Sequence, residues 1–328
     1  MMNPEELHIV MRSFQTSRVI LTAVELDVFA ELGENPRTAD DLARALSTDP
    51  RATTRVLDVL VTFGLLSKND GEYETTPLAA PLSSQHPESI RPIVLHMNHT
   101  WDNWSQLTET VRRGHNPESK RAAEMGGEVL KSFIGGMHVV GRRLSKGIAS
   151  AYDAGRFRHL LDIGGGSGTY TIAFLENYTD LRATLFDLPE VVAMARERLV
   201  KEGLLDRVTL VGGSFYRDEL PSGCDLAFLS AIIHQNSREQ NLDLYRKIHH
   251  AIEPGGVVLI RDHIMDEDRT YPPQGALFAL NMLVATEGGD TFTLAEMEDA
   301  LVEAGFENVR LLRRGEMMDC LLEAKKPI

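Results

Sequence analysis

The stretch 161–168, Leu-Asp-Ile-Gly-Gly-Gly-Ser-Gly, decides the fold class of this chain. An apolar run that enters a glycine cluster predicts a buried strand, then a tight turn and a helix. Four glycines within five residues are more than a turn needs, and they let the backbone approach a bound molecule closely. Position 169 is Thr, so the third glycine of a dinucleotide-binding G-x-G-x-x-G loop is absent. The spacing therefore favours an uncharged nucleoside with an amino-acid tail over a pyrophosphate.

Strands alternate with helices around this loop and onward to the end of the sequence. We expect strands at 159–163, 182–186, 208–211, 225–229 and 257–262, closing strands at 309–312 and 320–324, and helices at 170–177, 190–202, 238–252, 275–286 and 294–304. Such alternation is typical of a doubly wound α/β domain with a largely parallel sheet. Ligands of these domains bind at the carboxyl ends of the strands, where the strand order reverses.

The first 84 residues predict a separate module. Apolar residues at helical spacing cover 12–33, further helices begin near Thr38 and near Asp49, and a hairpin turns at Asp70-Gly71. This order is that of a winged helix, a common DNA-binding module. Residues 37–78 hold five basic and seven acidic side chains, however, and a DNA-reading helix needs a basic face. We therefore expect a packing and dimerisation module.

Residues 85–150 predict a helical bridge between the two halves, which gives domains at 1–84, 85–150 and 151–328. His96 and His99 are close enough in sequence to share a helix face. A metal site needs further ligands, and no third ligand has suitable spacing. We expect no metal site and no metal-assisted deprotonation.

Composition excludes several classes of partner. The chain has 328 residues, with 34 Lys and Arg against 48 Asp and Glu, a formal net charge of −14. Such a field repels nucleic acid and anionic membranes. No apolar stretch approaches the ~20 residues of a membrane span, and 1–10 lacks the basic-then-apolar pattern of a signal peptide. With only two cysteines, a cytoplasmic protein is expected.

Polar residues follow three of the predicted strands. Asp187 lies 23 residues after Gly164, the spacing at which a carboxylate accepts hydrogen bonds from both ribose hydroxyls. Ser214 and Phe215 follow the third strand, where Phe215 can stack on an adenine and Ser214 can hydrogen-bond to it. His234 follows the fourth strand, and an imidazole exchanges a proton near neutral pH. Asp262 ends the fifth strand, where it either orients the imidazole of His234 or caps the strand.

With these motifs, 161–168, 186–189 (Phe-Asp-Leu-Pro) and 212–215 (Gly-Gly-Ser-Phe), the chain resembles the S-adenosylmethionine-dependent small-molecule O-methyltransferases of the plant caffeic-acid and hydroxyindole type, in their bacterial branch. The likeness extends to 254–256, 266–270, 277–284 and 304–306 and covers nearly the whole chain. It implies a seven-stranded, Rossmann-like class I methyltransferase domain. It also implies a winged-helix N-terminal domain through which two copies of the chain dimerise.

The resemblance implies a role for each matching residue. Those expected to bind S-adenosylmethionine are Asp162, Gly164, Gly166, Gly168, Asp187, Leu188, Ser214, Phe215 and Ser230. His234 matches the general base and Asp262 a carboxylate that supports it. Phe133, Met137 and Met282 are expected to line the site of the methyl acceptor, where methionine side chains adapt to a flat ring. The expected reaction is a single displacement in which a hydroxyl oxygen attacks the sulfonium methyl.

The sequence departs from the family pattern at three places. Gln235-Asn236 replaces the usual Asp-Trp, Ser214 stands where an Asp often contacts the adenine, and Thr291-Phe292 replaces a Glu-Arg pair. His234 is thus left with less negative charge nearby. Three alternatives remain: transfer to sulfur, carbon or nitrogen, a non-methylating hydroxylase or decarboxylase that keeps the cofactor, and a ligand-sensing winged-helix regulator.

Overall fold

The computed structural model describes residues 2–33, 35–119 and 124–328, and the chain divides into two compact units. The first unit holds the residues up to 101 together with 131–139, and the second holds 102–130 and 140–328. Two helices, α5 (Arg91–Ser105) and α7 (Gly127–Ala151), contribute residues to both units. Within the described ranges, no helix combines the length and apolar character that crossing a membrane requires.

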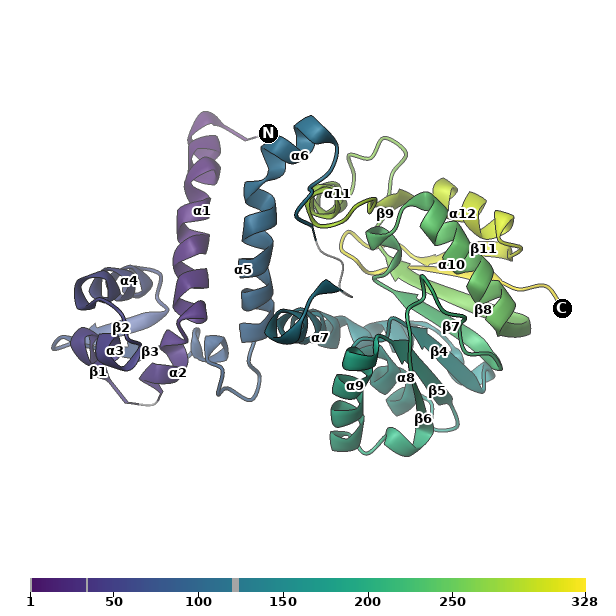
Figure 1. Ribbon diagram of the computed structural model, residues 1–328, viewed down its shortest axis with the longest axis horizontal. Helices are drawn as coiled ribbons and strands as arrows, with labels where there is room; N and C mark the ends of the chain where they lie inside the picture. Colours follow the sequence, from purple (N-terminus) through teal and green to yellow (C-terminus); the bar gives the residue numbers. More distant parts are fainter. Residues whose placement is uncertain (1, 34, 120–123) are drawn as a thin grey trace. The chain divides into compact units, whose positions relative to one another are not determined.

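The second unit is built on a seven-stranded sheet with the order β11-β12-β8-β7-β4-β5-β6 (Figure 1). Its strands are β4 (His159–Ile163), β5 (Arg182–Asp187), β6 (Val208–Gly212), β7 (Cys224–Ser230), β8 (Ile252–Asp262), β11 (Glu307–Arg313) and β12 (Cys320–Lys325). Only β12 runs antiparallel, to both of its neighbours. All seven predicted strands are confirmed, although β8 begins at Ile252 rather than at 257.

Helices cover both faces of this sheet. On one face, α10 (Arg238–Ala251) and α12 (Leu294–Glu303) pack on strand side chains such as Ala227 and Leu229. On the other, α8 (Thr169–Asn177), α9 (Pro189–Lys201) and the end of α7 pack on Leu226 and Phe228. Successive residues of β7 thus point to opposite cores, as the strand period requires. The strand order reverses between β4 and β7, which places the switch point of the doubly wound fold there.

The remaining elements of the second unit are short or lie beyond the sheet. They are α6 (Leu107–Arg113), η3 (Ala154–Arg156), η4 (Leu205–Arg207), η5 (Ile233–Gln235), β9 (Ile264–Met265), α11 (Pro273–Ala285) and β10 (Phe292–Thr293). Helix α11 is joined to the 102–130 segment by two hydrogen bonds: Trp104 donates to the Asn281 side chain, and the Asn116 amide donates to the carbonyl of Val284.

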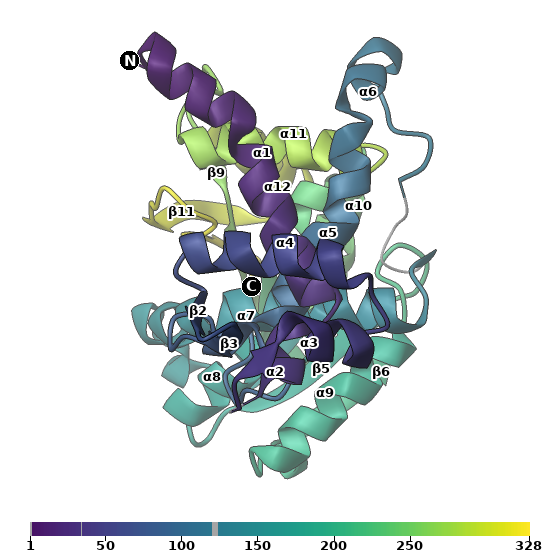
Figure 2. The same cartoon turned by 90° about the vertical axis from the view of Figure 1, so that its left-hand side faces the viewer.

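The first unit has the winged-helix order that the sequence predicts (Figure 2). Its elements are α1 (Pro4–Glu25), α2 (Val28–Leu32), β1 (Arg37–Thr38), α3 (Ala39–Ala45), α4 (Pro50–Thr62), β2 (Leu66–Asn69), β3 (Glu72–Thr75) and η1 (Ala80–Leu82). Thr38 and Asp49 cap α3 and α4 as expected. Strand β1 pairs with β3 and was not predicted.

The single helix predicted over 12–33 is wrong in extent. Helix α1 starts eight residues earlier, at Pro4, where Asn3 and Glu6 form a capping box. The helix then stops at Leu26, and Asp27 adopts a left-handed conformation with φ 57° before α2 begins. Apolar spacing alone does not reveal this break, because Val28, Phe29 and Leu32 continue to face the same core.

Candidate active site

The glycine loop after β4 depends on backbone conformations that L-residues avoid. Gly164, Gly166 and Gly168 have φ angles of 67°, 57° and 82°. A Cβ atom on Gly164 would lie 2.4 Å from the side chain of Ile232, so the loop is tightly packed there. A Cβ atom on Gly166 would meet nothing within 4 Å, so this glycine borders open space. The loop therefore has one packed side and one side free for a ligand.

Asp187 ends β5 beside this loop. Its carboxylate accepts hydrogen bonds from the backbone N–H of Gly166 (2.8 Å) and of Leu188 (2.7 Å). Burial raises the pKa of Asp187 to about 6. The structure thus brings Asp187, Leu188 and the loop together.

Asp162, one position before the end of β4, lies beneath the loop. Its side chain is 1% exposed and accepts a 2.5 Å hydrogen bond from the hydroxyl of Thr171, at the start of α8. Burial raises the pKa of Asp162 to about 6. Its carboxylate also lies 3.0 Å from the position of a Cβ atom on Gly165. Asp162 therefore ties the loop to the helix that follows it.

The ends of β6 and β7 complete this edge of the sheet. The Ser214 backbone N–H donates to Asp218, and Phe215 lies 3.8 Å from the Cβ position of Gly164. The hydroxyl of Ser230 accepts a 2.7 Å hydrogen bond from Arg261. Of these three residues, Phe215 thus lies against the glycine loop, whereas the contacts given for Ser214 and Ser230 are with other protein side chains.

His234 and Asp262 meet at the neighbouring strand ends. His234 lies in η5, just after β7, and Asp262 is the last residue of β8. The Nδ1 atom of His234 is 3.0 Å and 2.9 Å from the two carboxylate oxygens of Asp262. Burial opposes ionisation of this 2% exposed carboxyl, but the imidazole of His234, the backbone N–H of His263 and the charge of Arg261 together outweigh burial and lower the pKa of Asp262. An ionised Asp262 accepts the Nδ1 proton, and Nε2 is then left as the basic nitrogen.

Backbone contacts that the sequence does not reveal fix the turn that carries His234. Ala231 has a φ of 57°, and its N–H donates to the carbonyl of Arg261. The carbonyl of His234 accepts from the N–H of Asp290. A Cβ atom on Gly289 would lie 2.5 Å from that carbonyl, so only glycine lets the 286–290 segment approach so closely.

Asn236 and Asn241 anchor the other side of the turn. Asn236 is fully buried, donates to the side chain of Asn241 and accepts from the hydroxyl of Tyr216. Asn241 in turn donates to the carbonyl of Ile233, at the start of η5. Asn236, which stands at a departure from the family pattern, is thus part of the framework of the turn.

The aromatic side chain of Phe278, on α11, lies between His234 and His263. The ring of Phe278 is 4.9 Å from that of His234, edge-on, and 5.1 Å from that of His263. Met282, one turn further along α11, is 6% exposed. Phe278 was not singled out in the sequence, where it reads as one apolar residue among many. Phe133 and Met137 belong to the first unit, where Phe133 packs on His96 and Met137 is 37% exposed.

Thr291 stands where the family has the Glu of a Glu-Arg pair, so a buried hydroxyl replaces a carboxylate at this position. Thr291 is 2% exposed, its backbone N–H donates to the carboxylate of Asp290, and its hydroxyl donates to the carbonyl of Gly275 at 3.5 Å. Among the residues that the structure describes, Asp262 is the one carboxylate within hydrogen-bond distance of His234. No group of three or more His, Cys, Asp or Glu side chains within those ranges is arranged to hold a metal ion.

Comparison with known proteins identifies this arrangement. Residues 104–307 match the O-methyltransferase domain, and residues 9–84 match the O-methyltransferase dimerisation domain. The chain belongs to the O-methyltransferase family. It is 32% identical to the tetracenomycin polyketide synthesis 8-O-methyl transferase TcmO of Streptomyces glaucescens, over 91% of this chain and 90% of that protein.

Solved structures support the same assignment. The human N-acetylserotonin methyltransferase in complex with S-adenosylmethionine (SAM) superposes with a TM-score of 0.84 at 27% identity, covering 98% of this chain and 97% of the other. PigF with S-adenosylhomocysteine (SAH) superposes with a TM-score of 0.91 at 25% identity, over 99% and 100% of the two chains. The O-methyltransferase described here is therefore a SAM-dependent enzyme with a class I fold.

The glycine loop of this O-methyltransferase fits such a cofactor. Gly166 borders open space, and the Asp187 carboxylate lies next to it. The hydroxyl of Ser167 is buried and has no hydrogen-bond partner among the described residues, so a bound molecule can supply one. The loop carries no cation of its own, which suits an uncharged nucleoside.

Proposed function

We propose that this enzyme methylates a hydroxyl of a small aromatic or polyketide-like acceptor, with His234 as general base and without a metal ion. The observation that carries the proposal is the double contact of His234 Nδ1 with the carboxylate of Asp262, at 3.0 and 2.9 Å. With its Nδ1 proton donated to Asp262, the imidazole accepts a further proton at Nε2, the nitrogen that Asp262 does not contact. The acceptor class is inferred from TcmO and the acetylserotonin enzymes, whose names specify such acceptors.

SAM, when bound, supplies a methyl group that is already activated by the sulfonium charge. The chain's own residues then have two tasks. One is alignment, because holding two reacting atoms ~3–3.5 Å apart and in line supplies much of the rate. The other is removal of the hydroxyl proton by His234, which contributes roughly 10²–10⁴-fold. Asp262 stabilises the imidazolium that results, since the paired carboxylate is ionised.

The cofactor is held, in this proposal, by three groups of residues. Gly164, Gly166 and Gly168 shape the loop for the amino-acid tail, above Asp162. The Asp187 carboxylate, with the backbone of Leu188, takes the ribose. Ser214, Phe215 and Ser230 lie toward the adenine side. Phe215 is the stacking candidate, because it is half-buried beside Gly164.

The acceptor site, in this proposal, includes Met282 and Phe278, which lie next to each other on α11. Met137 and Met282 match positions that line the acceptor site in the family, and Phe133 is assigned to this site with them. Segment 85–150 thus serves the acceptor, whereas 151–328 carries the cofactor and 1–84 the dimer contacts.

The homodimer is proposed to form through α1. Leu7, Val10, Met11 and Phe14 are each more than half exposed, and their spacing puts them on one face of the helix. An exposed apolar stripe of this length is typical of a surface that a partner covers. It lies at and beside the segment that matches the dimerisation domain.

Methyl transfer from labelled SAM to a panel of phenols, with His234→Gln as the test variant, examines the proposal. We expect the variant to bind SAH like the unmodified enzyme while turnover falls roughly 10²-fold or more. Chelators should leave the rate unchanged. Turnover that survives the substitution excludes His234 as the base. SAH formed only with thiols or amines instead points to another acceptor atom.

A further inference from the structure

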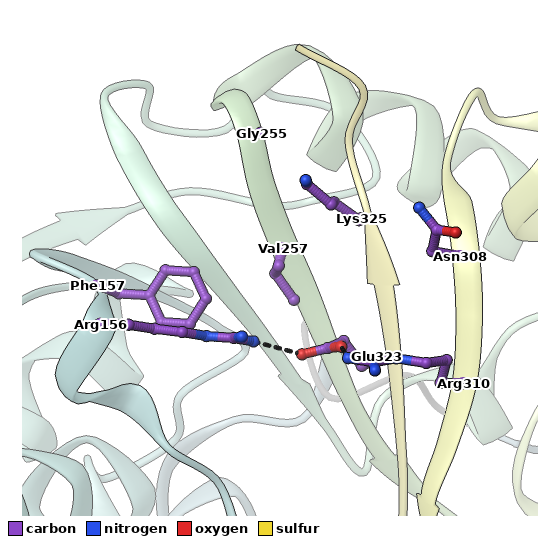
Figure 3. Close-up of a pocket in the computed structure, with 8 residues that line it drawn as sticks. All are labelled: Arg156, Phe157, Gly255, Val257, Asn308, Arg310, Glu323 and Lys325. Atoms are coloured by element: carbon purple, nitrogen blue, oxygen red, sulfur yellow. Dashed lines mark hydrogen bonds and ion pairs between the residues drawn. The ribbon is translucent and has the colours of Figure 1, made fainter.

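A hollow of about 460 Å³ lies near the start of β8, whereas His234 lies beside the end of that strand (Figure 3 shows the residues that line the hollow). Its lining comes from η3 and the residue after it, and from β8, β11 and β12: Arg156, Phe157, Gly255, Val257, Asn308, Arg310, Glu323 and Lys325. Val257 lies early in β8, whereas Asp262 ends that strand. Five extended residues span about 16 Å. The hollow is therefore separate from the methyl-transfer site.

The charges of this hollow do not cancel. Arg156 and Arg310 reach the carboxylate of Glu323 from opposite sides (Figure 3), the first at 2.7 Å. Glu323 is 4% exposed and also accepts a hydrogen bond from the hydroxyl of buried Tyr152. Burial opposes its ionisation, but the hydrogen bonds from Arg310 and Tyr152 and the positive charges of Arg156 and Arg310 together outweigh burial and lower the pKa of Glu323. Among the residues that line the hollow, there is thus one carboxylate and three cations, the third being Lys325.

Lys325 carries the unbalanced charge. Its ammonium has no carboxylate within 4 Å in the part of the chain that the structure describes, and Figure 3 shows it extending over the hollow. The two guanidinium groups keep further N–H donors, because each has five and their side chains are 49% and 62% exposed. Among the lining residues the positive charges exceed the negative charges by two, whereas Glu307, which pairs with Lys325 across β11 and β12, is not part of the lining. In a chain of net charge −14, this local excess favours an anion.

The walls of the hollow indicate an organic ligand. Its volume lies within the ~300–1,000 Å³ of small-molecule sites and exceeds what a lone phosphate needs. Phe157 and Val257 supply apolar surface. The guanidinium of Arg156 lies 4.8 Å from the centre of the Phe157 ring, and that ring stacks on Tyr152, so the wall is fixed in place.

We propose that this hollow binds a phosphate monoester of a small organic molecule. The phosphate lies against Arg156, Arg310 and Lys325. The planar guanidinium groups and the compact ammonium group can each donate hydrogen bonds to a doubly charged oxyanion. The organic part lies against Phe157 and Val257. Methyl transfer needs no such ligand, so the site is independent of the proposed acceptor.

Calorimetric titration of the full-length enzyme with phenyl phosphate, at saturating SAH, tests this site. We expect binding that weakens with added salt, because the contacts are ionic. Lys325→Gln should weaken binding about tenfold, the equivalent of one hydrogen bond to a charged group. This variant leaves the Arg156–Glu323–Arg310 cluster intact, so the fold is preserved. Arg196→Gln on α9, which removes the same charge from an exposed position, should leave binding unchanged.

Two ligand controls complete the experiment. Phenol, which lacks the phosphate, should show no Lys325-dependent binding, and this separates the hollow from the acceptor site. Inorganic phosphate should bind more weakly than phenyl phosphate, and equal affinities would remove the organic part from the proposal. The proposal is overturned if phenyl phosphate fails to bind at millimolar concentration, or if it binds Lys325→Gln as tightly as it binds the unmodified enzyme.

Discussion

His234 and Asp262 are 28 residues apart in sequence, yet their side chains are 2.9 Å apart because β7 and β8 are parallel neighbours. The carboxylate fixes the imidazole through Nδ1. Asp262→Asn keeps the shape but loses the charge that stabilises an imidazolium, and the amide can present its NH₂ to Nδ1. We expect kcat to fall about 10²-fold or more, with little change in SAH affinity.

Single-turnover methyl transfer measures this loss apart from product release. Asp299→Asn, an exposed position on α12, serves as the matched control and should retain full activity. An Asp262→Asn enzyme as fast as the control would show that Asp262 acts only as a strand cap.

The glycine loop allows a matched comparison of two substitutions. Gly166 and Gly203 have φ angles of 57° and 68°, and a Cβ atom would meet nothing within 4 Å at either. Alanine at each position should therefore cost a similar amount of stability, about 1 kcal/mol. Only Gly166→Ala should lower SAH affinity, by tenfold or more, because its methyl group occupies the ligand side of the loop.

Thermal unfolding and calorimetry of both variants, side by side, decide this point. Equal SAH affinities in the two alanine variants would mean that the cofactor does not approach Gly166.

Cofactor affinity should depend on pH through Asp187. Burial raises the pKa of this carboxyl to about 6, from an ordinary value of 3.8. Below that pH the free enzyme carries a proton on Asp187, and a protonated carboxyl accepts hydrogen bonds less well. SAH affinity should therefore fall as the pH decreases below about 6, by at most about tenfold per pH unit.

Titrations from pH 5 to pH 8 in matched buffers measure the effect. Asp187→Asn should bind SAH more weakly at pH 8 and show a flatter profile. A variant with the unmodified slope would assign the pH dependence to another group, such as Asp162.

The apolar face of α1 predicts where the dimer can be broken. Phe14→Asp places a charge within the stripe of Leu7, Val10, Met11 and Phe14, and should shift the protein toward monomer. Thr16→Asp adds the same charge to the opposite face of the helix, since two residues separate by about 200°. Size-exclusion chromatography with light scattering measures the mass of each variant and shows whether it is a dimer or a monomer. Dimers of equal stability in both variants would place the interface elsewhere.

Much of the catalytic unit was predictable because its signals are local. Glycine clusters and apolar runs mark the strand ends, and Asp187, His234 and Asp262 each follow such a run. These local signals predict the positions of all seven strands. Their order and pairing rest on the resemblance to a known fold, since periodicity carries no information about which strands are neighbours.

Other features depend on partners distant in sequence. Trp104 and Asn281 are 177 residues apart, and no local pattern in either segment predicts their hydrogen bond. Phe278 is distinguished only by its contact with His234. The break at Asp27 needs a left-handed residue, which the surrounding apolar pattern conceals. These features depend on tertiary contacts, which the pattern of residues along the sequence does not reveal.

The register of β7 on β8 has an evolutionary consequence. Ser230 pairs with Arg261, so the chain segments that carry His234 and Asp262 leave the sheet at the same level. A one-residue slip of β8 would turn Asp262 to the opposite face of the sheet. The neighbouring helix α11 is under no such constraint, because its side chains vary one at a time. Under the function proposed above, descendants of this chain can therefore change what they methylate, by substitutions along α11, while inheriting the His234–Asp262 pair unaltered.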